Sequence, residues 1–218
     1  MNLRYRFNQL LNTISPVRRE SYSWDLIYGL PRSGTTYLYH QMIQKSRFGI
    51  SDWDLQFFLP ALKEIGESDR TPISKTEIIS FLRTRIESNA PPGAGSSIDF
   101  VIKQVNTTPD EVMLLTEIMD SAPRNIYFLY REPQSWLPSA MKKYGIDKQS
   151  ASDLYVKCFE NFRLIGGSPI DYHHDIEGIL QELNIKPNTA FNPTTANSSY
   201  DGIEQLELLY GKFRNDQV

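Results

Sequence analysis

The sequence contains a single cysteine, Cys158, among its 218 residues. One cysteine cannot form an intramolecular disulfide or a cysteine-rich zinc site, and such usage favours a reducing compartment, here the cytoplasm. No stretch approaches the roughly 18 consecutive apolar residues of a membrane span, and no apolar signal core follows the start. We therefore expect an intracellular protein without a membrane span, in which Cys158 is half-buried on a helix.

The sequence also lacks a strong net charge. The formal charge is -3 and the isoelectric point is about 5.7, so there is no global attraction for nucleic acid. Any bound anion must therefore be held by a local group of donors in a pocket. The hydrophobic content of 40% is enough for one sizeable core, and we predict a single domain over residues 1–218.

The two ends of the chain leave alternatives open. Residues 1–20 carry arginines with no acid before Glu20, and their apolar residues recur at helical spacing. This pattern predicts an amphipathic helix packed on the domain, although a targeting peptide has similar features. Residues 188–218 are rich in Asn, Thr and Ser, which suits either an ordered binding loop or a disordered tail.

Between the ends, predicted strands alternate with predicted helices. The strands are 24–28, 98–105 and 125–130, and the helices begin at Thr36 and span 72–89, 109–120, 151–165 and 174–183. The last strand is continuously apolar and aromatic, as expected of a buried parallel strand. We therefore predict an α/β fold of three layers, with a central parallel sheet flanked by helices.

The turn between the first strand and its helix has the glycine spacing of a P-loop. Gly29 to Thr36 places backbone N–H groups where they can surround a phosphate. Thr35 stands where nucleotide kinases have a lysine, and the cation is Arg32 inside the loop. The strand ends run into Lys103 and Arg131 in place of an acid that would hold Mg²⁺. This set predicts an anion site that works without a metal.

Two motifs resemble those of the sulfotransferases that use 3′-phosphoadenosine 5′-phosphosulfate (PAPS). Residues Leu30–Tyr37 are similar to the 5′-phosphosulfate loop, most closely in the tyrosylprotein and bacterial members. Arg131, followed eight positions later by Ser139 on the next helix, is similar to the motif for the 3′-phosphate. The resemblance runs in order from about Trp24 to Leu183, and includes a late strand and helix around residues 169–172.

The resemblance implies a P-loop-type fold and an enzyme that moves a sulfuryl group from PAPS to a hydroxyl or phenol by in-line transfer. The product nucleotide is then 3′-phosphoadenosine 5′-phosphate (PAP), and no metal is required. The implied cofactor-binding residues are Pro31, Arg32, Ser33, Gly34, Thr35, Thr36, Tyr37, Arg131 and Ser139.

Three residues have expected roles in catalysis or in binding the nucleotide. Arg32 is expected to stabilise charge on the leaving oxygen, because a guanidinium stays protonated and cannot act as an acid. Tyr37 either stacks on the adenine or packs in the core. Lys103 is expected to contact the sulfate or the acceptor. The alternative is that it is a solvated lysine at a loop.

The acceptor needs a general base. Cytosolic relatives place a histidine after the second strand, but residues 104–108 contain none. Tyrosylprotein and bacterial relatives use a carboxylate about twenty residues beyond the loop, where Asp52 and Asp54 lie. One of them is the candidate base, unless the pair only forms a turn.

The three histidines and the nearby aromatic residues have less specific predictions. No histidine is expected to be the base, and His173 and His174 should cap a helix or face solvent. Four aromatic side chains could line a pocket for a small-molecule or tyrosine-like acceptor, or belong to the core. These are Trp53, Phe57, Phe58 and Trp136.

Two other functions remain open. A non-catalytic module that binds PAPS or PAP would keep the same motifs. A P-loop small-molecule kinase would share the fold but requires a lysine near Thr35 and a metal-holding acid. The sequence decides neither the acceptor nor the oligomeric state.

Overall fold

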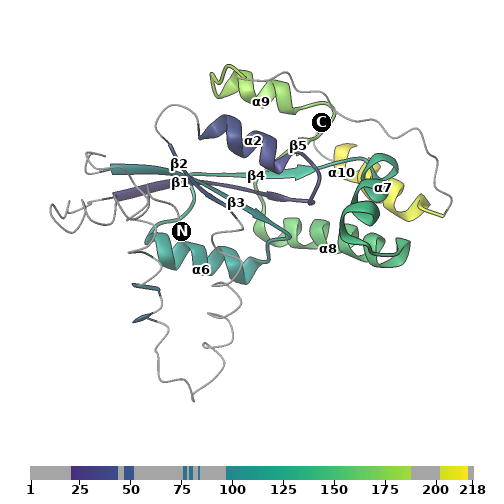
Figure 1. Ribbon diagram of the computed structural model, residues 1–218, viewed down its shortest axis with the longest axis horizontal. Helices are drawn as coiled ribbons and strands as arrows, with labels where there is room; N and C mark the ends of the chain where they lie inside the picture. The colour runs from purple at the N-terminus through teal and green to yellow at the C-terminus, as the bar shows by residue number, and fades with distance from the viewer. Residues whose placement is uncertain are drawn as a thin grey trace, which may run out of the picture. The chain divides into compact units, whose positions relative to one another are not determined.

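The computed structural model describes residues 21–43, 47–51, 76–77, 79–80, 83, 97–187 and 202–215. Its strands are β1 (Ser21–Gly29), β2 (Phe48–Ser51), β3 (Ser97–Val105), β4 (Asn125–Tyr130) and β5 (Ser168–Asp171). Its helices are α2 (Thr35–Met42), α6 (Pro109–Met119), α7 (Pro133–Tyr144), α8 (Lys148–Ile165), α9 (Ile176–Glu182) and α10 (Glu204–Asn215). Figure 1 carries the same labels.

The strands form one five-stranded sheet in the order β2-β3-β1-β4-β5. β2 runs parallel to β3 with Ile50 opposite Ile102, and β4 runs parallel to β5 with Leu129 opposite Ile170. The predicted α/β class, a central parallel sheet flanked by helices, is confirmed. β1 and β4 are neighbours, so the residues that follow them emerge at one edge of the sheet. Ligands of open α/β sheets bind at such carboxyl-terminal edges.

The contacts within the chain divide it into two compact units. Unit one comprises residues 1–26, 43–103 and 110–125, and unit two comprises residues 27–42, 104–109 and 126–218. The single domain over residues 1–218 stays a prediction. The P-loop-like turn and Arg131 both belong to unit two.

Unit two is built around the buried aromatic strand β4. Phe128 contacts Phe159 and Phe162 of α8 and Phe213 of α10, with ring centroids 4.5–5.8 Å apart. α2 and α9 cover one side of β4, and α8 and α10 cover the other (Figure 1). The core of unit two therefore joins β4 to α8 and to α10, the last helix of the described chain.

Part of the predicted tail is helical. α10 occupies residues 204–215, within the segment expected to be a loop or disordered. Its residues Leu206, Tyr210 and Phe213 recur at helical spacing, and Leu206 is buried. The polar composition of residues 188–218 concealed this short amphipathic pattern.

The boundaries of α8 and the setting of Cys158 also differ from prediction. α8 begins at Lys148, three residues before the predicted start, because Asp147 caps it by accepting a hydrogen bond from the Ser150 N–H at 2.7 Å. Cys158 is buried and not half-buried, and burial raises the pKa of its thiol to about 12. The thiol is therefore unreactive at neutral pH.

The structure describes some of the remaining predicted helices and strands completely and others only in part. The helices and strands expected at 98–105, 109–120, 125–130 and 174–183 are confirmed within two residues at each end. Of the helix predicted at 72–89, the described residues 76, 77, 79, 80 and 83 are helical. The segment 1–20 lies outside the described residues. No helix in the described part of the chain is both long and apolar enough to cross a membrane.

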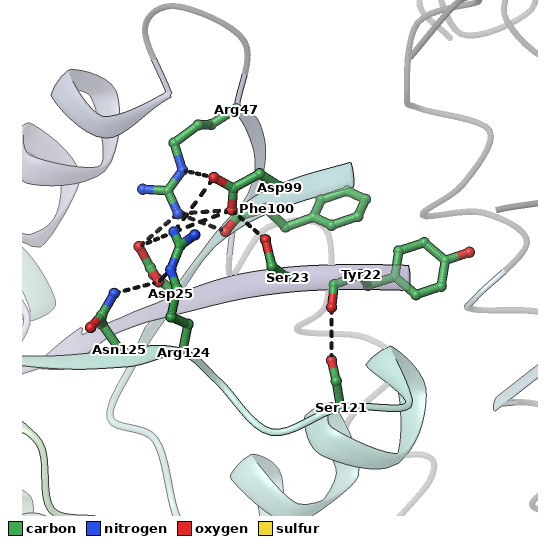
Figure 2. Close-up of polar contacts among 9 residues, drawn as sticks. All are labelled: Tyr22, Ser23, Asp25, Arg47, Asp99, Phe100, Ser121, Arg124 and Asn125. Atoms are coloured by element: carbon green, nitrogen blue, oxygen red, sulfur yellow. Dashed lines mark hydrogen bonds and ion pairs between the residues drawn. The ribbon is translucent and has the colours of Figure 1, made fainter. Parts of the chain in front are cut away.

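A buried ion cluster stabilises unit one, and we call it the Asp25 cluster (Figure 2). Asp25 is 1% exposed in β1 and accepts hydrogen bonds from Arg47 at 2.6 Å and from Arg124 and Asn125 at 3.0–3.1 Å. Asp99 of β3 accepts from the same two arginines at 3.1–3.4 Å. Burial pushes the pKa of Asp25 upward, but the hydrogen bonds from Arg124 and Arg47 outweigh it and hold the pKa below its usual value.

We predict that Asp25→Asn lowers the free energy of unfolding by about 3 kcal/mol, because it leaves two arginines with an incomplete set of buried partners. Urea denaturation measures the change. Asp120→Asn is the matched control, since the Asp120 side chain is 80% exposed and 4.0 Å from Arg83. Its effect should stay within about 0.5 kcal/mol. Equal effects of the two variants would contradict a stabilising role for the Asp25 cluster.

The same cluster predicts a pH dependence. The pKa of Asp25 is lower in the folded chain than in the unfolded chain. Its carboxylate therefore stabilises the fold above the unfolded pKa of about 3.9, and this contribution is lost as the pH falls through the folded pKa. The difference in unfolding free energy between the wild type and Asp25→Asn should shrink below about pH 4. A difference that stays constant between pH 7 and pH 3 would contradict the assignment.

Candidate anion-binding site

The loop between β1 and α2 is held by close backbone packing in unit two. Gly29 has φ +138°, and a Cβ there would lie 2.1 Å from the Leu129 carbonyl oxygen, so only glycine fits. The Leu30 N–H donates to the same carbonyl at 3.0 Å. The loop is therefore fastened directly to β4, the strand that leads to Arg131.

Ser33 strengthens this attachment from inside the loop. Its side chain is fully buried, and its hydroxyl lies within hydrogen-bond reach of the carbonyl oxygens of Leu30 and Leu129. Thr35 is buried and Thr36 is exposed in the first turn of α2. The first N–H groups of a helix have no partner within it and favour an anion. Ser33 thus holds the loop, while α2 offers the backbone donors.

Arg32 lies at the outer side of the loop. Its backbone adopts φ +69°, a left-handed conformation that costs a residue with a side chain about 1–2 kcal/mol. The guanidinium is exposed and its Nε donates to the hydroxyl of Ser139 at 3.2 Å. The strained turn therefore presents the cation toward α7.

Arg131 follows β4 directly and is only 4% exposed. Its Nε donates to the Ser135 hydroxyl at 2.7 Å, and its Nη1 lies 3.4 Å from the Arg32 carbonyl oxygen. The guanidinium carbon stands 4.4 Å from the ring centroid of Tyr172. Burial lowers the pKa of Arg131 and the nearby charge of Arg32 acts in the same direction, but the guanidinium remains protonated near neutral pH.

α7 supplies both serines. Ser135 and Ser139 are four residues apart, so they lie on one face of this helix. The pairs Arg32–Ser139 and Arg131–Ser135 form what we call the arginine–serine site. The sequence assigned Ser139 together with Arg131 to the 3′-phosphate, which stays a prediction, and it gave no role to Ser135. The four-residue spacing before Ser139 was the available signal for Ser135.

Two aromatic side chains hold the site in place. Trp136 is fully buried, and its indole N–H donates to the Pro31 carbonyl oxygen at 2.6 Å. It therefore belongs to the core, the second of the two alternatives for this residue. Tyr172 fills the space between Arg131 and the loop, because a Cβ at Gly34 would lie 2.9 Å from its ring.

His173 lies beside the Arg131–Ser135 pair. Its side chain is 10% exposed, and its Nε2 is 3.2 Å from the Ser135 hydroxyl and 3.4 Å from a carboxylate oxygen of Glu132. The prediction that His173 caps a helix or faces solvent is therefore wrong. His174 is exposed, as expected. No local pattern distinguishes the two neighbouring histidines.

The other predicted site residues are less closely placed. Tyr37 is half-buried on α2. Its burial raises the pKa of its phenol, and the charge of Glu177 adds a smaller increase. Lys103 belongs to unit one and is 5% exposed in β3, opposite Ser51 of β2, so it is not a solvated loop lysine. Five predicted residues lie outside the described residues: Asp52, Trp53, Asp54, Phe57 and Phe58.

Comparisons with known proteins establish no family. No family model matches the chain. No curated protein matches it either. Similar solved structures include the sulfotransferase domain of the Synechococcus PCC 7002 olefin synthase, at 12% identity over 90% of this chain and 97% of that one, with a TM-score of 0.48. A shikimate kinase from Bacteroides thetaiotaomicron is also 12% identical, over 75% of this chain and 99% of that one, with a TM-score of 0.42.

A sugar kinase from Janibacter sp. HTCC2649 is similar at 14% identity, over 78% of this chain and 99% of that one, with a TM-score of 0.40. Sulfotransferase and kinase structures thus both occur among the similar structures. Function has to be argued from the arginine–serine site itself.

We predict that Gly34→Ala destabilises the protein by at least about 1 kcal/mol. Gly34 has φ +85°, and an added Cβ would approach Ile176 to 2.8 Å and Tyr172 to 2.9 Å. Gly178→Ala in α9 is the matched control, because no atom lies within 4 Å of its Cβ position. This control should stabilise the protein by about 0.5–1 kcal/mol. Urea denaturation of both variants decides, and equal shifts would contradict the packing of Tyr172 against the loop.

Proposed function

We propose that the chain is a PAPS-dependent sulfotransferase that moves a sulfuryl group to a hydroxyl or phenol and releases PAP. The proposal is carried by one observation: two arginine–serine pairs lie together where the neighbouring strands β1 and β4 end. The Arg131 Nη1 lies 3.4 Å from the Arg32 carbonyl oxygen, and both guanidinium groups donate to serines of α7, which supports a single site for the two cations.

The donors of this site suit a nucleotide with two anionic groups. In this proposal the first turn of α2, together with Arg32, binds the 5′-phosphosulfate through Gly34, Thr35 and Thr36. Arg131 and Ser139 bind the 3′-phosphate, because a guanidinium offers a planar fork of charge-assisted donors. Ser139 would then exchange its bond with Arg32 for one with the ligand.

The remaining roles follow the chemistry of sulfuryl transfer, in which PAPS supplies the activated group. Arg32 stabilises charge on the leaving oxygen without giving up a proton. Asp52 or Asp54 is the proposed base for the acceptor hydroxyl, and Lys103 the proposed contact to sulfate or acceptor. Pro31 and Ser33 hold the loop, and Tyr37 is proposed to stack on the adenine. The acceptor is a small molecule or a tyrosine-like phenol.

Neither alternative has an observation that favours it over this proposal. A kinase would bind ATP with Mg²⁺ through a lysine and an acid. The acid at the end of β5, Asp171, already accepts hydrogen bonds from the Tyr210 hydroxyl and the His173 N–H. A non-catalytic module would bind PAP but modify no acceptor. Binding of PAP compared with ATP and Mg²⁺, together with an assay of sulfuryl transfer, separates the three functions.

We predict that the protein binds PAP, and that Arg131→Ala weakens binding by about 1.5–3 kcal/mol, or roughly 10- to 160-fold in Kd. Isothermal titration calorimetry measures the affinity. Arg131→Lys keeps the charge but loses the bonding fork, so it should also bind weakly, and it guards against misfolding of the alanine variant. Arg163→Ala, at an exposed position on α8, is the control and should bind as the wild type does.

Two outcomes would reject this assignment. Tight binding of ATP with Mg²⁺ and no binding of PAP would favour the kinase and remove the sulfotransferase proposal. Wild-type affinity for PAP in both folded Arg131 variants would show that the 3′-phosphate is bound elsewhere. Thermal unfolding curves establish which variants are folded.

We predict that Arg32→Ala reduces turnover about 100-fold or more while changing PAP affinity less, because a group that stabilises transition-state charge acts mainly on kcat. Transfer of labelled sulfate from PAPS to a panel of phenols, alcohols and sugars provides the assay. Arg163→Ala again serves as the control. Absence of transfer to any acceptor, with PAP binding intact, would support the binding module.

A further inference from the structure

A short hydrogen-bond chain connects His173 to Arg131. Arg131 Nε donates to the Ser135 hydroxyl at 2.7 Å, and this hydroxyl lies 3.2 Å from His173 Nε2. The His173 side chain is only 10% exposed. One serine hydroxyl therefore separates an imidazole that can gain a proton from a guanidinium that always carries charge.

Ser135 can bond to both partners in either protonation state of His173. Because arginine only donates, the Ser135 oxygen accepts from Arg131. With neutral His173, the hydroxyl hydrogen can point to Nε2. With protonated His173, Nε2 donates to Ser135 or to Glu132 at 3.4 Å, and the hydroxyl hydrogen turns to the Glu132 carbonyl oxygen at 3.3 Å. Proton gain thus leaves the Arg131–Ser135 bond in place.

This arrangement is not that of a nucleophilic triad. Ser135 and Glu132 both face the same ring nitrogen of His173. In a serine–histidine–acid triad the acid binds the other ring nitrogen and orients the imidazole. The cluster is therefore suited to holding charge and not to activating Ser135.

The position of His173 is set by surrounding elements of unit two. Its backbone N–H donates to Asp171 at the end of β5 at 2.8 Å, and Asp171 also accepts from the Tyr210 hydroxyl of α10. Its ring meets that of Tyr172 edge-on at 4.9 Å. The charged and titratable groups facing it are Arg131 after β4, Glu132 before α7, Asp171 of β5 and the adjacent His174.

These neighbours keep His173 neutral in the free protein near neutral pH. Burial lowers the pKa of His173, Glu132 and Asp171 act against this effect, and Arg131 and His174 reinforce it. A phosphate dianion beside Arg131 would add two negative charges at the same place. Opposite charge within a few ångströms raises the pKa of an imidazole.

We infer that His173 takes up a proton when a 3′-phosphomonoester binds beside Arg131, and so acts as a positioning residue that selects a doubly charged group there. The proton comes from solvent, and no covalent bond changes. The inference rests on the proposed function and goes beyond it, because it adds a proton-linked residue to the 3′-phosphate side of the arginine–serine site. Nucleotides without a 3′-phosphate should bind without this uptake.

The sign of the pH effect follows from linkage. If the pKa of His173 is higher in the complex than in the free protein, affinity rises as the pH falls through the bound-state pKa. The increase ends below the free-state pKa, where both states are protonated. Each unit by which the pKa rises changes Kd by about tenfold across this window.

The experiment is isothermal titration of PAP at pH 7 in two buffers with different heats of ionisation, which gives the number of protons taken up. The wild type should take up a fraction of one proton more than His173→Gln, whose amide can still bond to Ser135. His174→Gln, the exposed neighbour, is the matched control and should behave as the wild type. The ionisation of free PAP is common to all three proteins, so a difference between them reports the groups that titrate in the complex.

A second measurement does not depend on a variant. Ring-proton NMR of the wild type should show one histidine whose pKa rises when PAP is added, while the exposed His40 serves as the reference. Adenosine 5′-phosphosulfate, which lacks the 3′-phosphate, should leave that pKa unchanged.

The outcomes separate this inference from the proposed function. Equal proton uptake by the wild type and His173→Gln, with no histidine shifted in the NMR titration, overturns the role of His173 but leaves PAP binding intact. Failure of the wild type to bind PAP overturns the proposed function, and this inference with it. Proton uptake that persists in His173→Gln and vanishes in His174→Gln would overturn the role of His173 and assign the proton to His174.

Discussion

The burial of Arg131 at the end of β4 is the constraint around which the candidate site is organised. A cation that is 4% exposed is costly unless its donors are bonded. Ser135 of α7, the Arg32 carbonyl of the loop and the Tyr172 ring after β5 all contact this guanidinium. The elements that hold Arg131 are therefore also the elements that shape the site.

Charged side chains have different hydrogen-bond partners in the two units. In the Asp25 cluster, two arginines face two aspartates, so the charges are balanced within the protein. At the arginine–serine site, the side-chain hydrogen bonds of Arg32 and Arg131 described above go to hydroxyl and carbonyl oxygens. Such neutral partners orient a guanidinium through hydrogen bonds, and the charge of Glu132 also acts on Arg131 and raises its pKa against the effect of burial.

Prediction from sequence succeeded where a signal was local. The apolar run 125–130 and the glycine turn after residue 28 identified β4, β1 and the loop, because strand periodicity and glycine geometry act over a few residues. The short strand β2 escaped because four residues carry little periodicity. The helix α10 escaped because its apolar stripe is narrow and its segment is polar. The hydrogen bond between Arg32 and Ser139 was not predicted.

The sequence by itself determined the alternation of strands and helices, the loop, and the placement of Arg131 at the end of a buried strand. Only the tertiary structure decided that Ser139 meets Arg32, that Trp136 joins the core, and that His173 meets Ser135 with a side chain only 10% exposed while His174 is exposed. The physical reason is distance along the chain: Arg32 and Ser139 are 107 residues apart, and Ser135 and His173 are 38 apart. Hydrogen bonds between such residues depend on how strands and helices pack, and no local pattern encodes that packing.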